Sequence, residues 1–212
     1  MLDLDNTLGN RQAAIEAWTR EFVKVHRLNA AANDWILQAD NDGYSQRSQV
    51  FAQIRDRYGL TASVDDLVAS YQERVVELAA TTVGATDCLV ELRRRGHALA
   101  IVTNGSSKQQ HAKIDIMGLR PLVDAVVVSG DLDIQKPDRA MFDAAATETG
   151  TTLAGAWMVG DSAIHDVGGA QPLGVNTVWL HRSRPWPHGL EAPTAIIGEL
   201  TELVAVLDAQ QS

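Results

Sequence analysis

Ala98-Leu99-Ala100-Ile101-Val102 is a short apolar run with β-branched residues, and Thr103-Asn104-Gly105 follows it directly. A run of this length and composition predicts a buried strand. The residues after the run place a hydroxyl group and backbone amides at the carboxyl end of that strand. We therefore expect groups that can bind a ligand at this end of a sheet.

Two later segments repeat this pattern. Val126-Val127-Val128 leads to Lys136-Pro137, and Ala156-Trp157-Met158-Val159 runs into Gly160-Asp161-Ser162, with Asp166 five residues after Asp161. In open parallel α/β sheets the ligand crevice lies at the carboxyl ends of the strands. Polar residues that are far apart in the sequence are therefore expected to converge on one site.

The chain begins with a further polar cluster, Asp3-Leu4-Asp5-Asn6-Thr7. In an extended backbone Asp3 and Asp5 would share one side. If a metal ion and hydrogen bonds keep Asp3 ionised, it can attack phosphorus while Asp5 carries a proton to the leaving oxygen. Taken alone, the segment fits a turn with a helix cap equally well, because Asp, Asn and Thr bond to nearby backbone. The strand-end clusters favour the catalytic interpretation.

Taken together, these four segments resemble the motifs of the haloacid dehalogenase-like hydrolase superfamily, in the order in which that family carries them. The resemblance covers the chain at both ends, and the segment between the first two motifs fits the helical cap insertion of the family. It implies an α/β fold in which a Rossmann-like, doubly wound parallel sheet forms the core and a small α-helical bundle is inserted as a cap.

The resemblance also implies roles for single residues. Asp3 would be the nucleophile that forms an aspartyl-phosphate, and Asp5 the general acid and then the general base. Thr103 and Lys136 would hold phosphate oxygens, with Asn104 and the neighbouring backbone amides as further donors. Independently of the family, a carboxylate that attacks a phosphate dianion meets charge repulsion, so the site needs a divalent metal and an ammonium group. Lys136 is the candidate for that ammonium.

The expected cofactor is Mg²⁺. Magnesium prefers octahedral oxygen coordination and keeps several waters, which suits a site with few carboxylates. Asp3 and Asp161, with the backbone carbonyl of Asp5, are the expected ligands, and the resemblance implies that Asp166 supports the hydration shell.

The favoured function is hydrolysis of a small phosphorylated metabolite, a phosphoglycolate-, sugar- or nucleotide-like monoester. Relatives that cleave carbon–halogen bonds replace the second acid because a halide needs no proton, so Asp5 favours phosphate esters. Two alternatives stay open. A phosphomutase would use the same residues, and a non-catalytic binding or regulatory domain is favoured only by the short start.

Two departures from the family pattern stand in the first motif. Asn6 occupies a position where glycine is commonest, and asparagine tolerates left-handed backbone better than most residues. Only Met1-Leu2 precedes Asp3, whereas strands usually run about five or six residues. We therefore expect the natural chain to begin upstream of Met1.

Between the first two motifs the apolar period becomes helical, and residues 10–79 are expected to form the cap, with residues 1–9 and 80–212 as the core. The residues that carry the helical spacing include Ile15, Trp18, Phe22, Val50, Ile54, Tyr58, Leu67, Tyr71 and Val75. Arg47 could face a substrate carboxylate or hydroxyl, or it could simply be exposed. Trp18 and Trp35 could line the pocket or belong to the core of the bundle.

Composition restricts the partners. The 18 basic and 27 acidic residues give a net charge of -9, which argues against a nucleic-acid surface. Cys88 is the only cysteine, so no intrachain disulfide can form and a cytoplasmic setting is expected. No run of about 18 apolar residues occurs, so no membrane span is expected. The expected partner is a small phosphorylated metabolite, and the protein could be a monomer or a homodimer.

Overall fold

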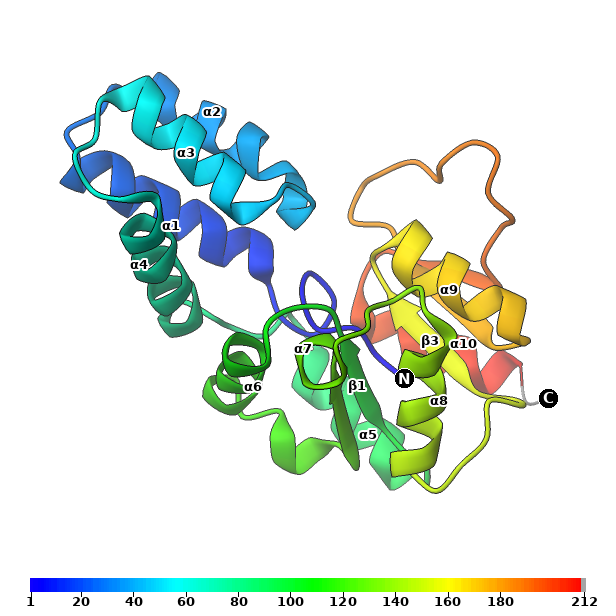
Figure 1. Ribbon diagram of the computed structural model, residues 1–212. Coiled ribbons are helices and arrows are strands. Elements are labelled where there is room, and N and C mark those ends of the chain that lie inside the picture. The colour runs from blue at the N-terminus through cyan, green and yellow to red at the C-terminus, as the bar shows by residue number, and fades with distance from the viewer. Residues whose placement is uncertain (211–212) are drawn as a thin grey trace. The chain divides into compact units, whose positions relative to one another are not determined.

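The computed structural model describes residues 1–210 and divides the chain into two compact units (Figure 1). Residues 1–10 and the chain from residue 81 onward form the first, which we call the α/β unit. Residues 11–80 form the second, which we call the helical unit. Within residues 1–210, no helix combines the length and the apolar character that crossing a membrane requires.

The α/β unit is built on parallel strands. β1 (Ala100–Thr103) pairs with β2 (Ala125–Val128), and β3 (Trp157–Gly160) pairs with β4 (Asn176–Leu180), which in turn pairs with β5 (Ala195–Ile197). Every pair is parallel, so all carboxyl ends lie at one edge. The three apolar runs named from the sequence form β1, β2 and β3.

Leu2 joins the two groups of strands. It forms parallel bridges with Ile101 of β1 and with Val159 of β3. The Leu2 N–H donates to the Ala100 carbonyl at 2.8 Å, and the Asp3 N–H donates to the Val159 carbonyl at 2.9 Å. The order across the sheet is therefore β2, β1, Leu2, β3, β4 and β5. This arrangement places Asp3 at the carboxyl edge, between β1 and β3.

Helices cover both faces of the sheet. Ile101 belongs to a buried cluster with residues of α5 (Ala85–Arg94) and α10 (Leu203–Ala209). Its neighbour Val102 points to the opposite face and packs with residues of α8 (Arg139–Glu148). Strands that are buried on both faces read as continuous apolar runs. The fold is thus the doubly wound, Rossmann-like α/β fold that the sequence predicted.

Shorter helical segments carry the chain away from the carboxyl edge. α6 (Ser107–Ile116) follows β1, and α7 (Ser129–Leu132) follows β2. After β3 come the π-helix η3 (Ala163–Val167) and α9 (Gly168–Ala170). Short 3₁₀ turns complete the unit: Arg120–Leu122, Gln171–Leu173 and Leu200–Glu202.

The helical unit contains four α-helices, α1 (Arg11–Val25), α2 (Ala31–Asp40), α3 (Arg47–Tyr58) and α4 (Val64–Glu77), with a short turn, η1 (Asn41–Gly43), after α2. Apolar residues at helical spacing on these helices form one buried cluster. They are Ile15, Trp18, Phe22, Ile36, Val50, Phe51, Ile54, Leu67, Tyr71 and Val75.

The two tryptophans of the helical unit pack within it. Trp18 is buried and meets the rings of Phe51 and Tyr71 edge-on, with centroid separations of 5.6 and 4.9 Å. Trp35 is half-buried and packs edge-on against Tyr58 at 5.8 Å. Edge-to-face pairs at these distances are the favoured aromatic geometry. Trp18 is therefore a core residue of the unit.

Candidate active site

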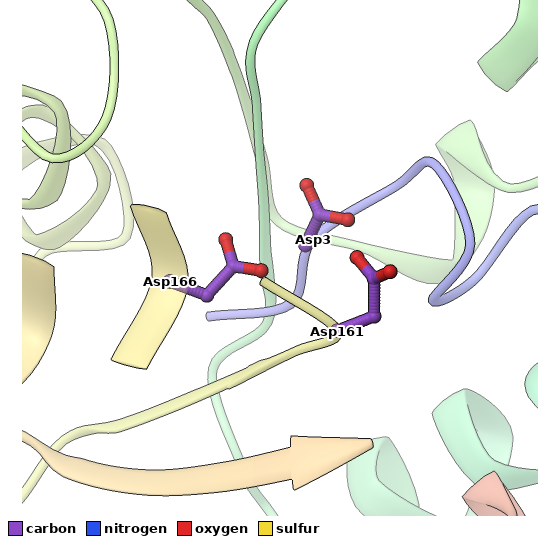
Figure 2. A group of neighbouring side chains, drawn as sticks. All are labelled: Asp3, Asp161 and Asp166. Atoms are coloured by element: carbon purple, nitrogen blue, oxygen red, sulfur yellow. The ribbon is translucent and has the colours of Figure 1, made fainter. Parts of the chain in front are cut away.

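Three buried carboxylates meet at the carboxyl edge of the sheet. Asp3 follows Leu2, Asp161 follows β3, and Asp166 lies in η3. One oxygen of each carboxylate lies within 4.8 Å of the corresponding oxygens of the other two. Figure 2 shows the three side chains near one another, with Asp3 on a different segment from Asp161 and Asp166. The sheet thus brings together three of the residues that the sequence singled out.

Gly160 makes room for one of these carboxylates. A Cβ atom at Gly160 would lie 2.1 Å from Oδ2 of Asp166, a separation that no real contact allows. The Ser162 N–H donates to the same oxygen at 2.9 Å. Asp166 therefore reaches its position only because the residue at the end of β3 has no side chain.

Lys136 lies between two of the acids. Its Nζ donates to Oδ1 of Asp3 at 2.7 Å and to Oδ1 of Asp166 at 2.6 Å, and the side chain is only 2% exposed. Burial lowers the pKa of the Lys136 ammonium, but the nearby carboxylates of Asp166 and Asp3 outweigh this effect and hold that pKa above its usual range. Lys136 is thus a fixed cation directly beside Asp3.

Asn104 holds the backbone of Lys136. Its Nδ2 donates to the Lys136 carbonyl at 3.0 Å, and its Oδ1 accepts from the Lys136 N–H at 2.8 Å. The Asn104 side chain thus fixes the lysine segment, and its expected part in phosphate binding stays a prediction. The Gly105 amide, one of the neighbouring backbone donors expected to face phosphate, donates to Ser129 Oγ at 2.9 Å. Its part in phosphate binding likewise stays a prediction.

The remaining two acids of the cluster have raised pKa values. Burial and the neighbouring Asp3 carboxylate raise the pKa of Asp161 to about 6, although Arg182 and Arg184 oppose the shift. Burial raises the pKa of Asp166 to about 7, against the effect of Lys136, and the Asp3 and Asp161 charges add to the increase. Burial is therefore the main reason that both acids hold a proton more tightly than a carboxylic acid does in water.

This arrangement fits a hard divalent cation. The donors are carboxylate oxygens, and magnesium takes oxygen ligands. A bound cation would relieve the repulsion between the carboxylates, which adds to the effect of burial on the two pKa values. The expected metal ligand from Asp5 is its backbone carbonyl, which stays a prediction, while the Asp5 carboxylate lies outside this cluster and contacts Lys113.

Asp5 is held by two side chains of α6 that the sequence analysis missed. Lys113 Nζ lies 2.9 and 2.8 Å from the two carboxylate oxygens of Asp5. Gln110 Nε2 donates to Oδ2 of Asp5 at 3.1 Å and to Oγ1 of Thr103 at 2.7 Å. The second acid and the strand-end hydroxyl thus share one network. No motif signals this network, because Gln and Lys on a helix normally indicate an exposed face.

Two arginines after β4 meet Asp161. Arg182 and Arg184 donate to Oδ2 of Asp161 at 2.8 and 2.9 Å, and the indole N–H of Trp179 donates to the Asp161 carbonyl at 2.9 Å. The segment after β4 thus places two arginines against a carboxylate of the site.

The turn after Asp3 is left-handed at Asn6. Its φ is +65°, and its N–H donates to the Gly9 carbonyl at 2.7 Å. The expectation that asparagine can replace glycine here is confirmed. Thr7 is fully buried, and its Oγ1 has no hydrogen-bond partner among residues 1–210.

Arg47 belongs to the helical unit. It donates to the buried carboxylate of Asp40 at 2.5 Å, and its guanidinium lies 4.9 Å from the centroid of the Tyr71 ring. Burial raises the pKa of Asp40, but hydrogen bonds from Arg11 and the charges of both arginines outweigh this and hold it below its usual range. The part of Arg47 in substrate specificity stays a prediction.

His165 belongs to the α/β unit and lies in η3. It is half-buried, and its Nδ1 lies 3.2 Å from Ser162 Oγ.

Comparison with known proteins identifies similar chains. The sequence pattern of the family described as haloacid dehalogenase-like hydrolase matches residues 1–180. The phosphoserine phosphatase of Thermus thermophilus is 38% identical over 115 residues, which are 54% of this chain and 46% of that protein. The chain therefore aligns with less than half the length of this relative.

Two other similar proteins align over most of their length. The (S)-2-haloacid dehalogenase 4A of Burkholderia cepacia is 28% identical over 199 residues, covering 93% of this chain and 79% of that protein. A crystal structure of the HAD-hydrolase YfnB from Bacillus subtilis, bound to magnesium, is similar with a TM-score of 0.78. It is 26% identical and covers 98% of this chain and 96% of that one.

Proposed function

This chain belongs to the haloacid dehalogenase-like hydrolase family, and from that membership we propose that it is a magnesium-dependent phosphatase. The substrate would be a small phosphorylated metabolite, a phosphate monoester. The observation that carries the proposal is the pair of acids at the sheet edge, each beside its own lysine. Asp3 lies against Lys136, and Asp5 lies against Lys113. The two acids thus have different surroundings, and we assign Asp3 as the nucleophile and Asp5 as the proton carrier.

In the first step, an oxygen of Asp3 bonds to phosphorus and the bond between phosphorus and the alcohol oxygen breaks. Asp5 gives a proton to that departing oxygen. In the second step, Asp5 takes a proton from water as the water oxygen bonds to phosphorus. The bond to Asp3 then breaks, which releases inorganic phosphate and restores the carboxylate.

Lys136 and Thr103 are the proposed phosphate ligands. A fixed ammonium beside Asp3 offsets the charge of the phosphate oxygens, and such preorganised charge is commonly the largest contribution to catalysis. Asp3, Asp161 and Asp166 would hold Mg²⁺, which when bound would reduce the repulsion between a carboxylate and a phosphate dianion. The cluster of three buried carboxylates supports this assignment.

Asp5 favours phosphate esters over haloacids. A halide leaves without a proton, so a dehalogenase has no need for an acid at this position. The similarity to a phosphoserine phosphatase supports the choice, while the similarity to a dehalogenase requires that both reactions be tested.

The test is release of phosphate from a panel of phosphate monoesters, with Mg²⁺ and with EDTA, alongside release of halide from 2-chloropropionate. We expect phosphate release that requires Mg²⁺, and loss of turnover by a factor of about 10³ or more in Asp3→Asn. Asp143→Asn, which removes a carboxylate of α8 whose side chain is 45% exposed, is the matched control and should retain activity. Halide release without phosphate release would overturn the proposal, as would full activity of Asp3→Asn.

A further inference from the structure

Two polar side chains of α6 are buried where a helix normally buries apolar ones. Gln110 is 1% exposed and Lys113 is 7% exposed. They are three residues apart, so they lie on the same face of the helix. Burying an amide and an ammonium group is costly unless each has partners. The partners in this case are residues of the candidate active site.

Lys113 restricts the carboxylate of Asp5. Its Nζ lies 2.9 Å from one oxygen and 2.8 Å from the other, so rotation of the carboxylate would lengthen at least one charge-assisted hydrogen bond. Asp5 sits at the start of a turn and is 27% exposed. A proton carrier must reach its acceptor at about 2.6–3.2 Å, and a freely rotating carboxylate would meet that geometry only part of the time.

Gln110 couples Asp5 to Thr103. Its Nε2 donates to both Asp5 Oδ2 and Thr103 Oγ1. A hydroxyl group has one hydrogen to donate and can accept at its lone pairs. Because Thr103 accepts from Gln110, its own hydrogen is directed elsewhere, and it makes a long hydrogen bond of 3.5 Å to the Asn104 carbonyl. One amide group of Gln110 thus contacts both the Asp5 carboxylate and the Thr103 hydroxyl.

Gly105 provides the space for this network. A Cβ atom at Gly105 would lie 2.8 and 2.9 Å from Cγ and Cδ of Gln110. Any residue with a side chain at position 105 would therefore displace Gln110. The network is separate from the Lys136 contacts, since that lysine pairs with Asp3 and Asp166.

We propose that Lys113 and Gln110 are positioning residues that hold the Asp5 carboxylate in the orientation from which it protonates the departing alcohol. This inference rests on the proposed phosphatase function. When the bond between phosphorus and oxygen breaks, the electron pair stays on the alcohol oxygen, and the proton from Asp5 neutralises it. The demand for this proton rises with the basicity of the alcohol. Loss of positioning should therefore harm substrates with basic leaving groups most.

The experiment compares kcat/KM for 4-nitrophenyl phosphate and for phenyl phosphate, whose leaving group is more basic. Under the two-step mechanism, kcat/KM reports the steps up to departure of the alcohol, so it is insensitive to the later hydrolysis. We expect Lys113→Met to lose about ten-fold more on phenyl phosphate than on 4-nitrophenyl phosphate. Gln110→Leu should show the same dependence on the leaving group, and Lys113→Arg should restore much of the loss. Lys108→Met changes an exposed lysine of the same helix and should have no effect.

The double variant Asp5→Asn/Lys113→Met tests whether Lys113 acts through Asp5. If it does, removing Lys113 from the Asp5→Asn protein should change kcat/KM less than about two-fold, because coupled residues are not additive. The double variant removes the charges of Asp5 and Lys113 together, so it leaves no unpaired charge. It therefore also provides the test if Lys113→Met alone does not fold. Equal losses on both substrates, or independent losses in the double variant, would overturn the inference. A wild-type protein that hydrolyses neither these two esters nor any monoester of the panel would instead overturn the proposed function.

Discussion

Gly160 shows how one residue without a side chain can decide whether a site forms. Its backbone does not require glycine, since its φ is not among the positive values. The requirement comes from Asp166, whose carboxylate occupies the space where a Cβ atom would lie. Gly105 is required on both grounds, since its φ is +147° and a Cβ atom there would crowd Gln110. In both cases the glycine is needed for a side chain elsewhere in the sequence.

Gly160→Ala is therefore expected to displace Asp166. Overpacking of this kind typically costs about 1–3 kcal/mol, and the carboxylate cluster would lose one member. We expect Mg²⁺ affinity, measured by isothermal titration calorimetry, to fall at least about ten-fold. Gly198→Ala is the matched control, since its Cβ atom would meet only side-chain ends at 3.3 Å. Unchanged Mg²⁺ binding in Gly160→Ala would show that Asp166 is not part of the metal site.

At the level of single residues, the sequence was informative where polar residues follow an apolar strand. Asp161 and Lys136 could be identified in this way, because parallel strands bring their carboxyl ends to one edge. Asp3 was identified instead from the cluster Asp3-Leu4-Asp5-Asn6-Thr7. Gln110 and Lys113 could not. Their types indicate an exposed helix face, and their burial depends on contacts with residues about a hundred positions away.

At the level of elements, the apolar pattern predicts a helix when the residues that the helix buries are apolar. α4 buries Leu67, Tyr71 and Val75 at helical spacing, so its period is visible in the sequence. α6 buries Gln110, Lys113 and Ile114, and no apolar stripe remains to predict it. β5 was missed for another reason. It has three residues, and Ile196 is exposed, so neither length nor alternation marks it as a strand.

The N-terminus of α4 supplies a prediction about local stability. Ser63 is its N-cap, and its Oγ accepts from the Asp66 N–H at 3.1 Å. Replacing such a cap with alanine costs about 1 kcal/mol. Ser63→Ala should therefore speed amide hydrogen exchange in the first turn of α4 about five-fold. Ser106, the N-cap of α6, makes no capping hydrogen bond, so Ser106→Ala should leave exchange in α6 nearly unchanged. Equal effects of the two changes would contradict the capping assignment.

At the scale of the whole molecule, the two units have separate cores. The cluster around Trp18 lies entirely within residues 11–80, whereas the cluster around Ile101 contains residues from both ends of the chain. Leu2 and Leu4 belong to that second cluster together with Leu203 and Leu207. The α/β unit thus depends on contacts between its first and last segments. Its only cysteine lies in the same cluster.

Cys88 can therefore report on the integrity of the α/β unit. It is 4% exposed, and burial raises the pKa of its thiol to about 11. The thiolate is the reactive form, so iodoacetamide at pH 8.5 should label the native protein far more slowly than the urea-unfolded protein.

The fold favours the protonated thiol of Cys88. This contribution to stability is therefore complete below the unfolded pKa of about 8.5 and is lost as the pH rises towards 11. Above pH 8.5, the free energy of unfolding of the wild type should fall more steeply than that of Cys88→Ala, by at most about 1.4 kcal/mol per pH unit. Parallel pH dependence in the two proteins, with rapid labelling of the native wild type, would show that Cys88 is not enclosed in this core.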